Sequence, residues 1–411
     1  MEGGRRERLV SLDAFRGFDI LTMVFVNYIA GMKAIPFFLR HAAADQDTFT
    51  LTDVVFPGFL FIVGVSIPLA LTRRKAGGAR TGALLGHVLV RTLALLFLGV
   101  LLVNEDRFSA AAAGMGKDLW YFLAALAVFA LWTVTPKGGH PPRTRLRLGL
   151  KIAAAVLLVA LVLVYRGQGP DGRVTWLQTS WWGILGMIGW CYLAGCLLFL
   201  ACRGNRAVLA GAIGLMTALY IGGRHGALGF LGPVDEFLNV GSLFGSHAAV
   251  VTAGMLAGTF FLPDPGGGSP RSRLRSLAAL GAGLLAAGFV LRPLHGFSKI
   301  HGTESYCLAT AGISTLVLLL FYLVLDVLKG GKMAGFLVPA GRNPLLAYLL
   351  PGFIANAAAL VGGLVHMDLF RVLWPFYGTG GLPGMLNAAV MTGIVLALTT
   401  VLSRAGLVLK L

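Results

Sequence analysis

Runs of about 20 apolar residues recur along the whole chain, and this pattern constrains the fold more than any other feature. Each run is long enough to cross the hydrocarbon core of a bilayer as an α-helix. No segment has the alternating pattern of a transmembrane β-strand, so the spans are expected to be helical. The sequence predicts about 12 spans, or 10–12 because 206–222 and 276–291 are short. The candidates are 15–33, 52–72, 84–104, 117–135, 149–166, 183–202, 206–222, 246–262, 276–291, 305–328, 343–361 and 386–404.

The composition excludes the other broad classes of protein. Only 12% of the 411 residues are charged and 57% are hydrophobic, whereas a soluble protein carries roughly 25% charged residues. So few charges cannot cover a water-soluble globule, and a disordered chain has the opposite composition. The sequence therefore predicts an all-α, polytopic integral membrane bundle. We expect residues 1–411 to form a single domain.

The net charge of +17 is explained by topology and does not indicate a nucleic-acid partner. The basic residues concentrate in alternate loops, and such loops face the cytoplasm by the positive-inside rule. Both termini are then cytoplasmic, and the expected surroundings are membrane lipids. Residues on this side include Arg5, Arg6, Arg8, Arg73, Arg74, Lys75, Arg80, Lys137, Arg143, Arg145, Arg147, Arg271, Arg273, Arg275 and Arg342.

Histidines and acidic residues gather instead in the loops of the opposite side. His41, His225, His247, Asp53 and Glu304 are examples. One interpretation is ordinary loop composition, since these loops have no need for lysine. The other is a polar, titratable pocket that opens outward, and the two remain open at this point.

The first span carries several polar residues on one face. At 100° per residue, Arg16, Asp19, Met23 and Asn27 fall along one stripe. Asp13 and Arg16 are i,i+3 neighbours that can pair on the helix surface. Ionisable groups inside a span face protein or a wet cavity. They indicate either a salt bridge that fixes helix packing or a pocket, and for Asn27, near the outer end, we expect a pocket role.

A histidine and a carboxylate flank the start of the second span. The loop 33–50 contains His41, and Asp53 lies at the outer end of the span, at the membrane level of Asn27. An imidazole is suited to taking a proton from an incoming nucleophile, and a carboxylate can orient it. We therefore predict catalytic roles for His41, Asn27 and Asp53, against the alternative of a solvated loop histidine. No spacing matches a metal motif, so no metal is expected.

At these residues the chain resembles the heparan-α-glucosaminide N-acetyltransferase family, which includes an animal lysosomal enzyme and many bacterial relatives. This resemblance implies that cytosolic acetyl-CoA donates an acetyl group to an amino sugar or glycan on the outer side. It also implies an essential histidine at His41, with Asn27 beside it, and a homodimer. We expect a bacterial inner membrane protein. The matching segments are RLVSLDAFRGFDILTMVFVNY (8–28), TDVVFPGFLFIVGVSI (52–67), WWGILGMIGWCYLAG (181–195), SKIHGTESYCLATAG (298–312) and GRNPLLAYLLP (341–351).

Coenzyme A is large and polyanionic, so its expected site is the cytoplasmic side, where positive charge and helix ends gather. Arg16, Arg73, Arg74 and Arg342 are candidates for its phosphates, and Asn343 precedes a proline that suits a helix start. For any one of these arginines, a purely topological role is the alternative.

Two other functions remain open from the sequence. A transporter or flippase of a polar or lipid-linked sugar would use the same intramembrane polar residues as a translocation path. An inactive relative that acts as a partner subunit is also compatible, because Gly186 and Met187 stand where the animal members carry a Gln-Arg pair.

Overall fold

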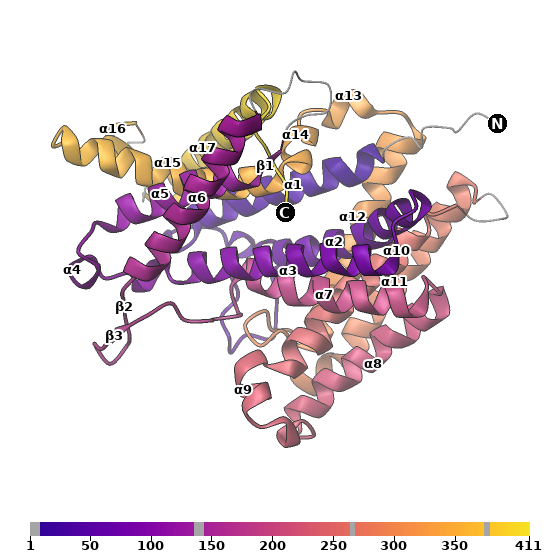
Figure 1. Ribbon diagram of the computed structural model, residues 1–411. Helices are drawn as coiled ribbons and strands as arrows, with labels where there is room; N and C mark the ends of the chain where they lie inside the picture. Colours follow the sequence, from indigo (N-terminus) through magenta and orange to yellow (C-terminus); the bar gives the residue numbers. More distant parts are fainter. Residues whose placement is uncertain (1–8, 135–143, 264–267, 374–378) are drawn as a thin grey trace. The chain divides into compact units, whose positions relative to one another are not determined.

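Helices make up most of the chain in the computed structural model (Figure 1). The structure describes residues 9–134, 144–263, 268–373 and 379–411. Five of the basic residues assigned to the cytoplasmic side, namely Arg5, Arg6, Arg8, Lys137 and Arg143, lie outside the described residues.

Most described residues of each expected span are helical, although some spans end earlier than expected: the first helix ends at Ile29, four residues before the expected bound at 33. The two short candidates lie in helices of 19 and 26 residues. Nine described helices are long and apolar enough to cross a membrane, which confirms an all-α, polytopic membrane architecture. The number of spans and the side of each terminus stay predictions. The helices are α1 (Val10–Ile29), α2 (Leu51–Ala76), α3 (Thr81–Val103), α5 (Lys117–Trp132), α6 (Thr144–Val164), α7 (Ile184–Cys202), α8 (Arg206–Arg224), α10 (Ala248–Thr259), α11 (Pro270–His295), α12 (Glu304–Phe321), α15 (Pro344–Leu364) and α17 (Gly381–Arg404).

Short elements connect or extend these helices. Two π-helices, η4 (Gly241–His247) and η5 (Tyr322–Val327), precede α10 and extend α12. The remaining short helices are η1 (Phe37–Leu39), η2 (Glu105–Arg107), α4 (Ala110–Ala113), η3 (Gly229–Leu231), α9 (Pro233–Leu238), α13 (Gly331–Ala334), α14 (Val338–Arg342) and α16 (Leu369–Leu373).

The chain divides into two compact units, and the first is built from Met1–Asp19, Phe37–Leu93 and Met187–Arg342. Within it, α2 packs against α10, and α11 packs along α12. Glycines let α2 and α10 approach each other closely, because a Cβ at Gly64 or Gly254 would collide with backbone of the opposite helix. Small residues of this kind let membrane helices approach each other closely.

The second unit comprises Ile20–Pro36, Ala94–Gly186 and Asn343–Leu411. In this unit α5 packs against α6 and α15. Two pairs of two-residue strands add antiparallel bridges. The pairs are β1 (Thr133–Val134) with β4 (Val408–Leu409), and β2 (Gly167–Gln168) with β3 (Val174–Thr175). The expectation of a single domain stays a prediction.

Candidate active site at the start of helix α2

Helix α2 is defined at both ends by charges that suit its dipole. Thr50 is the N-cap residue and Asp53 lies in the first turn. Arg73 and Arg74 lie in the last turn, before the C-cap Gly77. Because a helix N-terminus favours negative charge and a C-terminus favours positive charge, the sequence places the Asp53 carboxylate where a buried anion is best tolerated.

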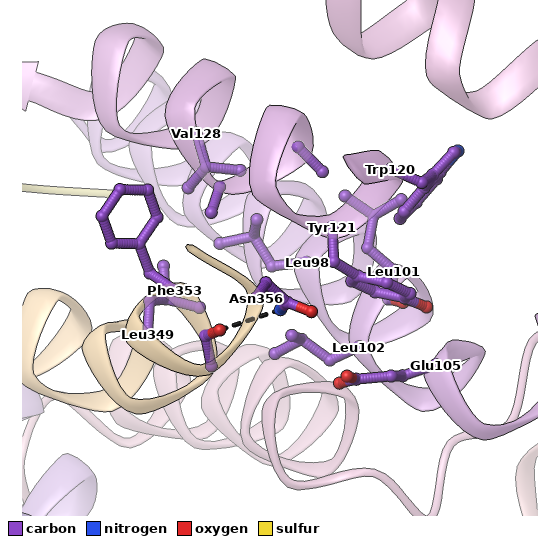
Figure 2. A pocket seen from close by; sticks show the side chains of 13 residues that line it. Leu98, Leu101, Leu102, Glu105, Trp120, Tyr121, Val128, Leu349, Phe353 and Asn356 are labelled. Carbon is purple, nitrogen blue, oxygen red and sulfur yellow. Dashed lines mark hydrogen bonds between the residues drawn. The ribbon is translucent and has the colours of Figure 1, made fainter. Parts of the chain in front are cut away.

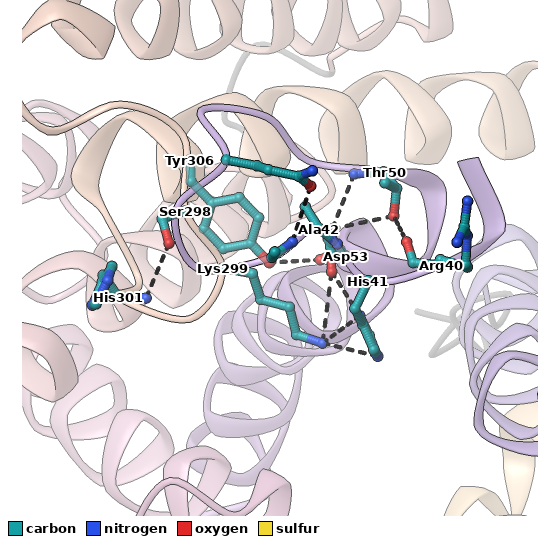
Figure 3. Close-up of polar contacts among 11 residues, drawn as sticks. Arg40, His41, Ala42, Thr50, Asp53, Ser298, Lys299, His301 and Tyr306 are labelled. Atoms are coloured by element: carbon teal, nitrogen blue, oxygen red, sulfur yellow. Dashed lines mark hydrogen bonds and ion pairs between the residues drawn. The ribbon is translucent and has the colours of Figure 1, made fainter. Parts of the chain in front are cut away.

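Asp53 is fully buried, and its carboxylate accepts hydrogen bonds on both oxygens (Figure 3). Its Oδ1 atom lies 2.7 Å from Nδ1 of His41. Its Oδ2 atom accepts from the backbone N–H groups of Ala42 and Thr50, each at 3.1 Å, and lies 3.1 Å from the Thr50 hydroxyl. The carboxylate therefore fixes both the histidine ring and the loop that carries it.

This contact assigns the proton on the His41 ring. An ionised carboxylate only accepts hydrogen bonds, so Nδ1 of His41 carries the hydrogen and donates it to Asp53. The lone pair is then on Nε2. The His41 side chain is 39% exposed, and Nε2 is the ring nitrogen that Asp53 does not contact. The structure thus brings together His41 and Asp53, two of the three predicted catalytic residues.

Lys299 completes this cluster, and sequence reasoning missed it. Its Nζ atom lies 2.9 Å from Nδ1 and 3.3 Å from Nε2 of His41, and 3.8 Å from Oδ1 of Asp53. Burial lowers the pKa of Lys299 from its usual range, against the attraction of the Asp53 carboxylate, which raises it. We call His41, Asp53 and Lys299 the His41 cluster.

A second set of contacts ties the loop of His41 to the loop of Lys299. Asp47 accepts a 2.6 Å hydrogen bond from the backbone N–H of Phe297 and a 3.0 Å hydrogen bond from Nε of Arg292. These bonds, with the Phe297 contact foremost, lower the pKa of Asp47. The Tyr306 hydroxyl also donates to the backbone carbonyl of Asp53 at 2.6 Å. Two segments far apart in sequence are thereby held together.

Asn27, the third predicted catalytic residue, lies near the end of α1, with an exposed side chain, in the second unit. Its role beside His41 stays a prediction. Asp19, on the same helix, is buried in the first unit, where a Cβ at Gly58 would lie 2.9 Å from its Oδ1 atom.

The arginines predicted for coenzyme A occupy two different settings. Arg16 donates to the Ser66 hydroxyl at 2.8 Å and to the Gly341 carbonyl at 3.1 Å. It also lies 3.6 Å from Asp13, which confirms the predicted i,i+3 pair. Asp13 lies 3.5 Å from Nε of Arg342 as well, whose side chain is 54% exposed.

Arg73 and Arg74, by contrast, are exposed at the end of α2. Asn343 is buried in the second unit, where its amide nitrogen donates to the Ser403 hydroxyl at 2.9 Å and its amide oxygen accepts from the backbone N–H of Leu409 at 3.1 Å. The roles of all five predicted donor-binding residues stay predictions.

The second unit contains a separate small cavity of about 60 Å³ between α3, α5 and α15 (Figure 2). Its lining is mainly apolar. The amide of Asn356 donates to the Gly352 carbonyl at 2.8 Å, and the Tyr121 hydroxyl donates to the Leu101 carbonyl at 3.3 Å. None of the predicted site residues lines this cavity. In the described part of the chain, no group of three or more His, Cys, Asp or Glu side chains is arranged to hold a metal ion.

The fold and the site define a polytopic, all-α membrane protein whose histidine is oriented by a buried carboxylate beside a lysine. The family model described as "Domain of unknown function (DUF5009)" matches residues 8–228. That match covers more than half of the chain, which therefore belongs to this family.

Two curated relatives confirm the resemblance seen in the sequence motifs. Heparan-alpha-glucosaminide N-acetyltransferase of Mus musculus is 32% identical over 138 residues, which are 31% of this chain and 20% of the mouse protein. The Homo sapiens protein of the same name is 39% identical over 99 residues, which are 24% of this chain and 14% of the human protein. The matched part of the chain thus spans a fifth or less of each relative's length.

Proposed function

We propose that this protein is a transmembrane acetyltransferase, which moves an acetyl group from cytosolic acetyl-CoA to an amino sugar or glycan on the outer side of the membrane. The observation that carries the proposal is the 2.7 Å contact between Nδ1 of His41 and the buried Asp53 carboxylate, which leaves Nε2 as a base. Support comes also from the named activity of the two relatives.

In the proposed reaction, Nε2 of His41 takes a proton from the acceptor amine as the amine nitrogen attacks the thioester carbonyl. A C–N bond forms and the carbonyl π electrons move onto oxygen. When the carbonyl re-forms, the C–S bond breaks and the coenzyme A thiolate leaves, taking the proton from the imidazolium. Asp53 keeps the ring in the tautomer that this sequence of steps needs.

The proposed donor site lies at the ends of α2 and α14. Arg73 and Arg74 are exposed and the half-exposed Arg342 has Asp13 beside it, so their guanidinium groups are accessible to phosphates. Arginine suits phosphate because it donates paired hydrogen bonds. A homodimer in a bacterial inner membrane is a further part of the proposal, and it rests on the resemblance alone.

The test is acetyl transfer from labelled acetyl-CoA to amino sugars by purified protein. Wild type should transfer, and His41→Ala should lose transfer while it still unfolds cooperatively in detergent. His366→Asn is the matched control, because His366 is exposed in the second unit with φ of 53°, a backbone conformation that asparagine tolerates. Transfer that survives in His41→Ala would refute the catalytic assignment.

The same assay separates direct transfer from an acetyl-histidine intermediate. If the acetyl group first moves to Nε2 of His41, thiol release from acetyl-CoA occurs in a burst without any acceptor. Direct transfer, which we propose, gives no such burst, and thiol appears only when the amino sugar is added.

A further inference from the structure

The loop that carries Lys299 is held rigidly, although it lies outside regular secondary structure. This loop, residues 296–303, joins α11 to α12. The Thr303 hydroxyl donates to the Gly296 carbonyl at 2.9 Å, and the backbone N–H of Ser298 donates back to that hydroxyl at 3.0 Å. The Tyr220 hydroxyl donates to the His301 carbonyl at 3.0 Å. Such bonds restrict the backbone on both sides of Lys299.

Gly302 adds a second restriction on this loop. It has φ of 58°, a conformation that favours glycine. A Cβ at this position would collide with the ring of the buried His247. The loop therefore lies directly against a packed side chain, and with Asp47 bonded to Phe297 its position is fixed relative to the loop of His41.

The position of the ammonium group is the second part of the argument. Nζ of Lys299 lies 3.3 Å from Nε2 of His41, the atom that carries the lone pair. It is also 3.8 Å from Asp53, which compensates its charge in the resting protein. Its side chain is 26% exposed, so the charge is partly shielded from water. Figure 3 shows the amine of Lys299 beside the His41 ring.

A carbonyl attacked by an amine next to Nε2 develops negative charge on oxygen, within reach of that ammonium. We infer that Lys299 is a catalytic residue whose ammonium stabilises the oxyanion of the tetrahedral intermediate. This inference rests on the proposed acetyl transfer. The negative charge moves onto the carbonyl oxygen as the C–N bond forms, and it returns to the carbonyl as the C–S bond breaks, so Lys299 neither gains nor loses a proton. Fixed charges aimed at a developing oxyanion are among the largest contributions to catalysis.

The experiment compares kcat and KM for Lys299→Met, which keeps the length and apolar stem and removes the charge, with Lys299→Arg, which keeps the charge. Lys299→Met should lower kcat by about 10²–10³-fold, the usual effect of removing one oxyanion donor. KM for the acceptor should change less than about two-fold, because the negative charge on the carbonyl oxygen, which the ammonium stabilises, develops only in the transition state. Lys299→Arg should recover at least about ten-fold over Lys299→Met. Lys329→Met, at an exposed lysine of the same unit, should behave like wild type.

Each outcome decides the inference. A Lys299→Met protein with kcat within about two-fold of wild type overturns it, and so does a change confined to KM, which would assign the lysine to acceptor binding. If Lys299→Met does not unfold cooperatively, Lys299→Gln is measured instead against the same limits. Absence of any transfer by wild type overturns the proposed function and this inference together, whereas transfer by wild type with an unaffected Lys299→Met overturns this inference alone.

Discussion

Replacing Asp53 by asparagine tests the site most sharply, because the change is nearly isosteric and its consequence depends on which way the amide turns. In one orientation of the asparagine amide, its NH₂ group occupies the position of Oδ2 and faces the backbone N–H groups of Ala42 and Thr50, which are also donors. Two buried donors then lose their acceptor, at about 1–3 kcal/mol each. With NH₂ at the position of Oδ1, both backbone bonds survive and the amide faces His41.

The second orientation is therefore favoured by about 2–6 kcal/mol. In that orientation the amide donates to Nδ1 of His41, so the ring proton moves to Nε2. The fold is retained, but the lone pair that acts as the base is on the wrong nitrogen. We expect Asp53→Asn to lower kcat by about 10³–10⁴-fold, or about 4–5 kcal/mol of transition-state stabilisation, as amide substitutions in other His–carboxylate pairs do.

The assay is acetyl transfer from labelled acetyl-CoA together with the thermal unfolding midpoint in detergent. The reasoning predicts that activity falls steeply while the midpoint moves little. Asp45→Asn, in the same loop and exposed, is the control for removal of one negative charge and should keep most of its kcat. An Asp53→Asn protein that retains more than about a tenth of wild-type kcat would refute the tautomer argument.

Three further predictions address loop fixation, helix packing and donor binding. Folding lowers the pKa of Asp47, so the Asp47 carboxylate contributes its full stabilisation above about pH 4 and loses it as the pH falls through the folded-state pKa. The unfolding midpoints of wild type and Asp47→Asn should therefore differ at pH 7 and converge in acid. A difference that stays constant with pH would contradict this prediction. Gly254→Ala should destabilise the protein by about 1–3 kcal/mol because its Cβ meets backbone of α2, whereas Gly86→Ala, at an open position in α3, should be neutral or stabilising by up to about 1 kcal/mol, both measured by thermal unfolding. Arg73→Ala and Arg74→Ala should each raise KM for acetyl-CoA about 10-fold with kcat little changed; unaltered KM in both variants would exclude them as phosphate ligands.

Hydropathy predicted the positions of the helices well, and its errors have a physical cause. The span expected at 276–291 belongs to α11, which runs from Pro270 to His295. Its ends carry Arg271, Arg273 and Arg292, which lower the local hydropathy although the backbone remains helical. Long basic side chains can lie along an apolar helix and extend their charge to the interface, so a hydropathy window ends before the helix does.

The two parts of the His41 cluster differ in how far the sequence could reveal them. His41 lies in the loop before α2 and Asp53 in the first turn of α2, 12 residues apart, so local reasoning could pair them. Lys299 is 258 residues from His41, and no periodicity connects them. The available signal was that this lysine lies in a loop predicted to face outward, where the positive-inside rule predicts few basic residues.

The burial of Asp53 explains why an active site made of loops can still be precise. A fully buried carboxylate is costly unless donors surround it, and here the required donors are the backbone of the His41 loop, His41 itself and the nearby Lys299. Satisfying the carboxylate therefore forces the histidine, its loop and the lysine into one arrangement. The start of helix α2, where the dipole favours a negative charge, lowers the free-energy cost of burying this carboxylate. The same carboxylate that stabilises the helix end through Oδ2 thus also sets the tautomer of the proposed base through Oδ1.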